Sequence, residues 1–148
     1  MYSIQATFTA LALCAVAASS ALAQSDFAQV AAKESGAKVT ASGLVFRSLQ
    51  DGQGASPSAT DKVKVHYRGT FPDGKEFDSS YKRNQPIDFP LNAVIPCWTE
   101  GVQLMKVGGK AKLTCPPGIA YGARGAGGVI PPNATLQFEV ELIAIAGR

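Results

Sequence analysis

The stretch 94–105, Val-Ile-Pro-Cys-Trp-Thr-Glu-Gly-Val-Gln-Leu-Met, constrains the fold most, because it holds the single tryptophan and the clearest helical pattern. Pro96 suits the first position of a helix, where its missing N–H leaves no bond unmade. Trp98, Val102 and Met105 recur at i, i+4 and i+7, which predicts one apolar face. A helix this short is marginal alone, so it must pack against other elements.

The segments around this helix alternate between apolar and polar residues, a pattern typical of strands with one buried face. The expected strands cover 43–49, 62–68, 87–89, 110–115 and 135–142. The predicted fold class is therefore α+β, with an antiparallel sheet wrapped over one short helix. We interpret Trp98, at the helix start, as the floor of an apolar pocket between helix and sheet. The alternative interpretation makes Trp98 an ordinary core residue.

The first residues of the chain have the pattern of a secretory signal peptide. No charged side chain precedes Asp26, and an apolar run ends in Ala21-Leu22-Ala23, an A-x-A cleavage site. We expect residues 1–23 to be a signal peptide cleaved after Ala23, leaving a periplasmic or secreted protein without a stable membrane span. Residues 24–42 are expected to form a short N-terminal arm, helical or frayed, and residues 43–148 a single domain.

Two cysteines, Cys97 and Cys115, follow the predicted cleavage site. An even count in an exported protein favours a disulfide. Cys97 lies at the helix start, and Cys115 lies on the predicted inner face of the next strand. Consecutive elements usually pack together, which predicts that the two thiols meet. The alternative is two buried free thiols that act as small apolar residues.

Composition and motifs exclude several function classes. The formal charge is +3 and the basic residues are scattered, so nucleic acid is not expected as a partner. The single histidine, His66, falls on the charged face of its strand, which favours a surface role and argues against His-based metal sites. No metal and no cofactor are expected.

The side chains that remain as candidates for a functional site are aromatic and aliphatic, with one carboxylate, Asp78. The alternative interpretation of Asp78 is that it only caps the turn at Ser79 and Ser80. Rotation about a prolyl peptide bond needs no nucleophile or metal, because its barrier arises from amide resonance. A pocket that removes the carbonyl oxygen from water and favours the twisted amide would suffice. The candidate pocket residues are Tyr67, Phe77, Asp78, Val94, Ile95, Trp98, Tyr121, Ile130 and Phe138.

Five stretches follow one another along the chain: Val65-His66-Tyr67-Arg68-Gly69, Asp73-Gly74-Lys75-Glu76-Phe77-Asp78-Ser79-Ser80, Val94-Ile95-Pro96-Cys97-Trp98, Ala120-Tyr121-Gly122 and Ile130-Pro131-Pro132-Asn133-Ala134-Thr135-Leu136. In this order they resemble the FKBP-type peptidyl-prolyl cis-trans isomerases. The resemblance runs from about residue 43 to 145. It implies a twisted antiparallel sheet curled around a short helix, and isomerase activity on proline-containing unfolded or nascent polypeptides.

The resemblance also implies roles for individual residues. Trp98 matches the pocket floor, Tyr121 a rim hydroxyl that donates to a ligand carbonyl, and Arg83 the partner of Asp78. Ile87 stands where many members carry an aromatic wall residue. The expected catalytic residues are Asp78, Tyr121, Trp98, Phe77 and Tyr67, and the expected substrate-binding residues are Arg83, Ile87, Val94, Ile95, Val129, Ile130 and Phe138.

Family members bind the macrolides tacrolimus and rapamycin, so the resemblance makes these candidate ligands here. Exported relatives often carry a long helical dimerisation arm, for which 24–42 is too short, so we expect a monomer. Two alternatives stay open. One is a chaperone-like module that holds proline-containing segments with little turnover, and the other is an interaction domain with a vestigial pocket. Acceleration of cis/trans exchange in a proline peptide separates them from an isomerase.

Overall fold

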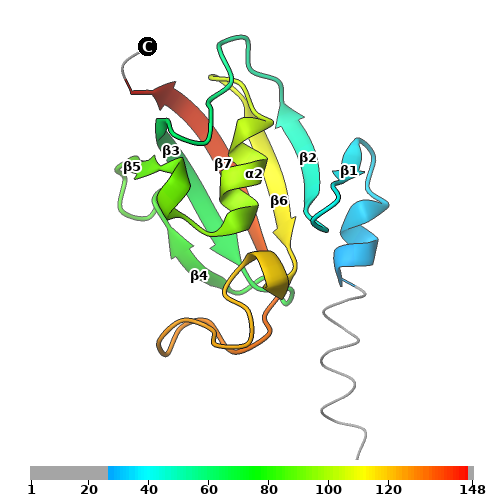
Figure 1. The fold of residues 1–148 in the computed structure, drawn as a ribbon. Helices are drawn as coiled ribbons and strands as arrows, with labels where there is room; N and C mark the ends of the chain where they lie inside the picture. Colours follow the sequence, from blue (N-terminus) through cyan, green and yellow to red (C-terminus); the bar gives the residue numbers. More distant parts are fainter. Residues whose placement is uncertain (1–26, 147–148) are drawn as a thin grey trace, which may run out of the picture.

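A single antiparallel sheet of seven strands forms the framework of residues 27–146, the part of the chain that this computed structural model describes (Figure 1). The strand order is β1-β2-β6-β7-β3-β4, and β5 also pairs with β3. The predicted signal peptide, residues 1–23, lies outside the described residues. The strands are β1 (Ala37–Val39), β2 (Val45–Gln50), β3 (Lys62–Thr70), β4 (Glu76–Ser79), β5 (Ile87–Pro90), β6 (Lys110–Cys115) and β7 (Leu136–Ile145).

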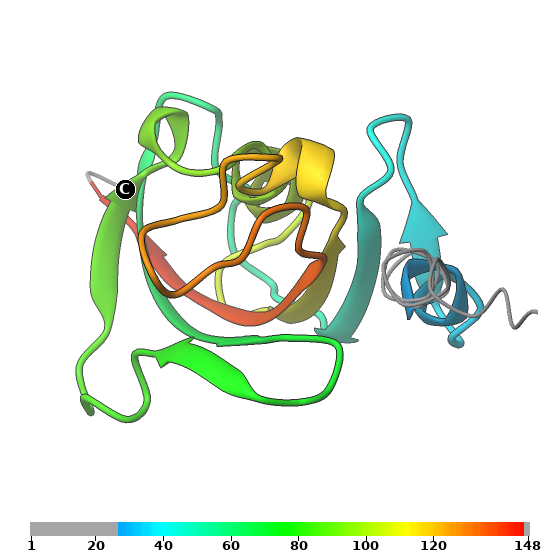
Figure 2. The same cartoon turned by 90° about the horizontal axis from the view of Figure 1, so that it is seen from below.

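The predicted helix forms as α2 (Pro96–Gln103), with Pro96 at its first position as expected. Trp98, Val102 and Met105 are all buried, which confirms the predicted apolar face. Viewed from below, the sheet curls around α2 (Figure 2). Gly101 permits this close packing, because a Cβ atom there would lie 2.9 Å from the methyl groups of Leu113 on β6. Two short 3-10 helices, η1 (Leu91–Ala93) and η2 (Pro117–Ile119), flank these elements.

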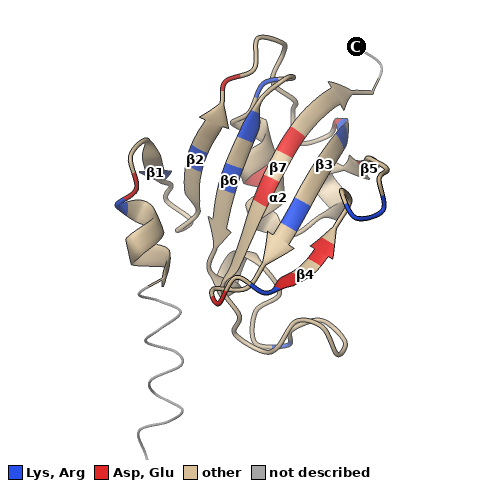
Figure 3. Ribbon diagram, turned by 180° about the vertical axis from the view of Figure 1, so that it is seen from behind, with Lys and Arg blue, Asp and Glu red and all other residues tan. Residues whose placement is uncertain are grey.

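The sheet has one apolar face and one charged face. Alternate residues of β3 and β7 are buried, as the sequence pattern predicts. On the outer face the acidic residues of β7 lie between basic residues of β6 and β3 (Figure 3). Glu139 is directly opposite Lys112 on one side and Arg68 on the other. Opposite charges that face each other across adjacent strands favour this pairing.

The N-terminal arm is part of the sheet. Residues 27–32 are helical, and β1, which the sequence pattern did not predict, pairs with the predicted strand β2. Glu34 forms ion pairs with Lys112 (2.9 Å) and Arg47 (2.7 Å). The hydrogen bond from Lys112, with the help of Arg47, holds the pKa of Glu34 below its ordinary value despite some burial. None of the helices in the described residues is long and apolar enough to span a membrane.

Candidate active site

Trp98 lies at the centre of a box of aromatic rings. The rings of Tyr67, Phe89 and Phe138 stand nearly perpendicular to the indole, with centroid distances of 5.2, 5.5 and 5.5 Å. Phe77 extends the box through an edge contact with Phe138 at 5.6 Å. Edge-to-face pairs of this kind add about 0.5–1.5 kcal/mol each beyond the area that they bury. The indole is only 4% exposed, so the surrounding rings fix its orientation.

A cavity of about 450 Å³ opens above this indole. It lies between the first turn of α2, the inner face of β3 and β7, and the long loop that joins β6 to β7. In Figure 2 this loop crosses the view in front of the sheet. The cavity is lined by Tyr67, Phe77, Asp78, Phe89, Ala93, Val94, Ile95, Trp98, Tyr121 and Phe138. A concave, mostly apolar site with a few polar groups is what a small ligand or a peptide side chain requires.

The polar wall of the cavity is a three-residue network around Asp78. The Tyr67 hydroxyl donates a hydrogen bond to Oδ2 of Asp78. The Arg83 guanidinium donates to Oδ1 of Asp78 at 2.8 Å and to the Tyr67 oxygen at 3.1 Å. Each group therefore holds the other two, and the carboxylate is fixed at the edge of the aromatic box.

This network sets the protonation states of its members. Burial acts to raise the pKa of Asp78, but the hydrogen bonds from Arg83 and Tyr67 outweigh it and keep the pKa below its ordinary value. Burial, together with the hydrogen bond to Asp78, raises the pKa of Tyr67. Near neutral pH the wall thus presents a carboxylate, a neutral phenol and a guanidinium.

The structure brings together most of the residues that the sequence singled out. Eight of them line the cavity, and Arg83 donates a hydrogen bond to Asp78, one of the eight. Ile87, Val129 and Ile130 are not among the lining residues. Ile87 pairs with Val65 in the sheet, Val129 is 56% exposed, and Ile130 is buried in the core.

Phe89 and Ala93 also line the cavity, although the sequence analysis did not include them among the candidate pocket residues. Phe89 supplies an aromatic ring two positions after Ile87, the residue that the resemblance places where many family members carry an aromatic wall residue. The sequence could have indicated Phe89, because alternate residues of a strand share a face and Ile87 was already a candidate pocket residue. Phe89 contacts both Tyr67 and Trp98, at 6.0 and 5.5 Å between ring centroids.

His66 lies outside the cavity, as its place on the charged strand face predicts. Its Nδ1 atom lies 2.8 Å from the Ser80 hydroxyl, and its ring stacks on Tyr81 at 4.6 Å. Burial and the hydrogen bond to Glu141 raise the pKa of Tyr81 to about 12. These contacts give His66 a role in the outer face of the sheet.

Cys97 and Cys115 are joined by a disulfide, with their Cα atoms 5.9 Å apart. Both residues are fully buried. The bond ties the first turn of α2 to the end of β6, directly beside Trp98 in the sequence. It therefore braces the floor of the cavity against the sheet.

Fold and cavity together define a class of protein. The model of the FKBP-type peptidyl-prolyl cis-trans isomerase family matches residues 53–143, and the chain belongs to this family. The FKBP-type isomerase FkpA of Aeromonas hydrophila is 59% identical over 114 residues, which cover 77% of this chain and 42% of the relative. The FKBP-type 22 kDa isomerase of Escherichia coli K12 is 54% identical, with coverages of 77% and 55%. The chain thus spans about half the length of these curated relatives.

Solved structures confirm the predicted fold. The crystal structure of FkpA from Escherichia coli superposes with a TM-score of 0.83 at 46% identity, over 87% of this chain and 60% of that one. A peptidyl-prolyl cis-trans isomerase from Pseudomonas syringae pv. tomato gives a TM-score of 0.79 at 42% identity, over 86% of this chain and 94% of that one. The resemblance inferred from the five sequence stretches is therefore correct.

The packing of the aromatic box predicts the effect of one glycine substitution. A Cβ atom at Gly69 on β3 would lie 2.5 Å from Cζ of Phe77 and 3.0 Å from Cε1 of Phe138. Gly69→Ala is expected to displace both rings and to lower the free energy of unfolding by about 1–3 kcal/mol, as overpacking does. Gly118→Ala is the matched control, because its Cβ would meet no atom within 4 Å. Denaturant titration of both variants tests this, and equal stability would contradict it.

The lowered pKa of Asp78 predicts a pH dependence of stability. A carboxyl with a depressed folded pKa contributes stability above its unfolded pKa of about 3.9, and loses it as pH falls through the lower folded value. The Tm of the wild type should therefore exceed that of Asp78→Asn by a constant margin above about pH 5, and the margin should shrink below pH 4. Asp88→Asn, at an exposed position on β5, is the control. A margin that is independent of pH would contradict the prediction.

Proposed function

We propose that this protein is a peptidyl-prolyl cis-trans isomerase that accelerates rotation of X–Pro bonds in folding polypeptides. The observation that carries the proposal is the apolar cavity floored by Trp98 with the Asp78–Tyr67–Arg83 network on one wall. The proline ring would lie against the indole, inside the aromatic box. Its partners would be unfolded or nascent segments that contain proline.

The chemistry follows from what the cavity removes and what it supplies. Amide resonance gives the planar peptide bond a polar carbonyl, which water solvates well. Among apolar walls that solvation is lost, so the planar form loses more than the twisted form does. Hydrogen-bond donors at the rim can then favour the twisted state, which is transition-state binding. Tyr121, 39% exposed at the mouth of the cavity, is the side chain we assign to donate to a substrate carbonyl.

The carboxylate of Asp78 has a different part in this proposal. We place the turning carbonyl of the X–Pro bond beside this carboxylate, which hydrogen bonds from Arg83 and Tyr67 hold in position. A preorganised polar group needs no reorientation during rotation, which is why fixed dipoles stabilise transition states well. Asp78 thus positions the Tyr67 hydroxyl and shapes the polar wall.

The test is a cis/trans exchange assay on tetrapeptides that vary the residue before proline. The expected result is exchange faster than the uncatalysed rate for several of these peptides, with competition by tacrolimus as a probe of the cavity. Binding of the peptides without acceleration would instead assign the protein to the class of proline-segment binding modules. No binding and no acceleration would reject both functions.

We also propose that the chain is exported and processed near Ala23, leaving the arm and the domain. The Ala21-Leu22-Ala23 site and the Cys97–Cys115 disulfide support export, since such bonds persist in oxidising compartments. Expression of the full chain in a bacterial host should give periplasmic protein whose first residue is Gln24. N-terminal sequencing checks this, and soluble protein that retains Met1 would contradict it.

A further inference from the structure

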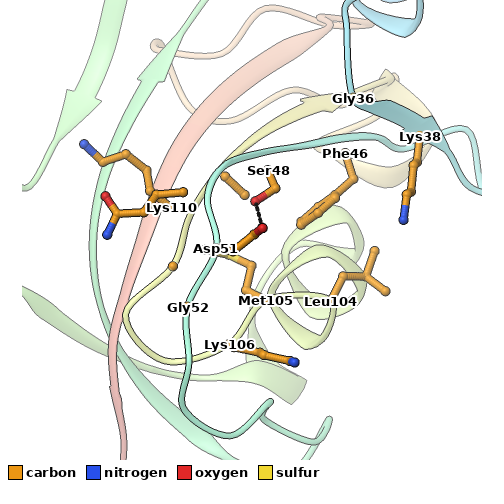
Figure 4. A pocket seen from close by; sticks show the side chains of 13 residues that line it. Gly36, Lys38, Phe46, Ser48, Asp51, Gly52, Leu104, Met105, Lys106 and Lys110 are labelled. Carbon is orange, nitrogen blue, oxygen red and sulfur yellow. Dashed lines mark hydrogen bonds between the residues drawn. The ribbon is translucent and has the colours of Figure 1, made fainter.

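A second cavity, of about 300 Å³, lies just beyond the C-terminal end of α2 (Figure 4). It exists because the sheet is wider than the helix that covers it. Lys38 of β1 is directly opposite Phe46 of β2, so both side chains project from the helix-facing side of the sheet. Since α2 ends at Gln103, this part of the face is left open as a groove between β1, β2 and the residues after the helix.

The floor of the groove is apolar. Phe46, Met105 and Ala111 line it and are all buried. Leu104 forms one wall and is 52% exposed, because it caps α2 outside the buried helix face. A single exposed leucine is unremarkable on a protein surface. Here it stands beside a cavity with an aromatic floor, which is where an apolar side chain of a partner would gain most from burial.

Two lysines flank this wall. Lys38 and Lys106 lie on either side of Leu104 in Figure 4, and both are exposed. Within residues 27–146, neither forms an ion pair. The acidic residue of the groove, Asp51, already accepts a hydrogen bond from the Ser48 hydroxyl at 2.6 Å. Lys110 also lines the groove, but its ammonium group lies 5.9 Å from the ring of Tyr81.

We propose that this groove binds an acidic, apolar segment of a client polypeptide, with a leucine-like side chain on Phe46 and carboxylates near Lys38 and Lys106. The inference rests on the proposed isomerase function, because it assigns the groove to the same client. Charge complementarity selects acidic segments over basic ones, and the apolar floor selects against segments that are only acidic.

The groove and the active cavity lie at opposite ends of α2. Trp98 and Leu104 are six positions apart, about 9 Å along a helix. The two positions are also about 120° apart around the helix, so an extended client segment, at about 3.3 Å per residue, needs more than three residues to pass from one site to the other. One unfolded client could therefore occupy both sites, and the second contact would raise occupancy of the first through effective concentration.

The proposal is tested with a fluorescent, proline-free peptide in which Leu and Glu alternate, titrated with the mature protein. Control peptides replace Leu by Ser or Glu by Lys. The Leu/Glu peptide should bind at least about tenfold more tightly than either control, and more weakly at high salt because exposed charges are screened. An excess of a short proline tetrapeptide should not displace it. Displacement, or equal binding of all three peptides, would overturn the proposal.

Variants locate the binding. Lys38→Glu/Lys106→Glu should weaken the Leu/Glu peptide by about tenfold or more, since two attractions become repulsions. Lys62→Glu/Lys75→Glu changes the net charge equally at exposed positions outside the groove and should leave binding unchanged. Leu104→Ser tests the apolar wall and should also weaken binding. Equal weakening by both double variants would overturn the proposal.

Two further readouts separate the outcomes. The kcat/KM for a short proline tetrapeptide should be unchanged in all three variants, because none of these residues lines the active cavity. Exchange activity without peptide discrimination would reject the groove and leave the proposed function standing, whereas absent activity in the wild type would reject the proposed function itself. Sedimentation is the last readout: a wild-type dimer that Leu104→Ser dissociates would assign the groove to a second copy of the chain, against the proposal.

Discussion

Asp78→Val is expected to lower kcat/KM for a proline tetrapeptide by about tenfold or more, equivalent to about 1.4 kcal/mol of transition-state stabilisation. The substitution removes the acceptor that the Tyr67 hydroxyl and the Arg83 guanidinium share. Valine is similar in size to aspartate but offers no polar atom, so the phenol and the guanidinium are free to turn away from the cavity. The loss should fall on kcat more than on KM, because the apolar floor that binds proline is untouched.

The fold should survive this change. The Asp78 side chain is 41% exposed, so its removal leaves no buried charge, and the aromatic box does not depend on it. Two companion variants separate its partners. Tyr67→Phe removes the hydroxyl and keeps the ring that packs on Trp98, and Arg83→Gln removes the charge. Each should give a smaller loss than Asp78→Val. Unchanged activity in Asp78→Val would contradict the prediction and leave the carboxylate only a role in the turn, where it accepts a hydrogen bond from the Ser79 backbone.

The alternation of the central strands made most of the sheet predictable. β3, β6 and β7 each bury one face on α2 and leave the other in water. Apolar and polar residues therefore alternate along these strands, and this alternation is visible in the sequence. The helix was predictable for a related reason. Trp98, Val102 and Met105 mark its buried face, and Pro96 marks its start.

The N-terminal arm shows what such patterns do not contain. β1 is only three residues long and lies at the sheet edge, so it has no alternation to read. Its position depends on contacts with residues far away in the chain, since Glu34 pairs with Lys112 and Arg47. Ion pairs of this kind become visible only when the tertiary structure places the partners together.

The sequence allowed the chemical character of the cavity to be predicted, but not every residue that lines it. An aromatic and aliphatic inventory with one carboxylate already indicated a reaction that needs no nucleophile. The exact wall depends on the register of β5, where Phe89 is opposite Val63 and Ile87 is opposite Val65. It also depends on the long loop, which buries Ile130 and leaves Val129 outward. Neither register nor loop path follows from local sequence.

The second large effect is expected on reduction of the Cys97–Cys115 disulfide. The bond closes a loop with a sequence separation of 18. The chain-entropy model gives about 3 kcal/mol of stabilisation for a loop of this length, because the cross-link restricts the unfolded chain. Urea titration of oxidised and reduced protein should show this difference in the free energy of unfolding. The comparison changes no packing atoms, unlike a Cys97→Ala/Cys115→Ala variant, which also loses buried volume.

Accessibility sharpens the disulfide prediction. Both cysteines are 0% exposed, so reductant should reach them only through unfolding, and the native protein should resist dithiothreitol. Unfolded, unreduced mature protein should then show no free thiols in a titration, while prior reduction in denaturant should expose two. Since the bond fixes the first turn of α2 to β6, reduced protein that refolds should hold Trp98 less firmly and lose kcat/KM along with stability. Two free thiols in the unreduced protein, or equal stability of both forms, would contradict the prediction.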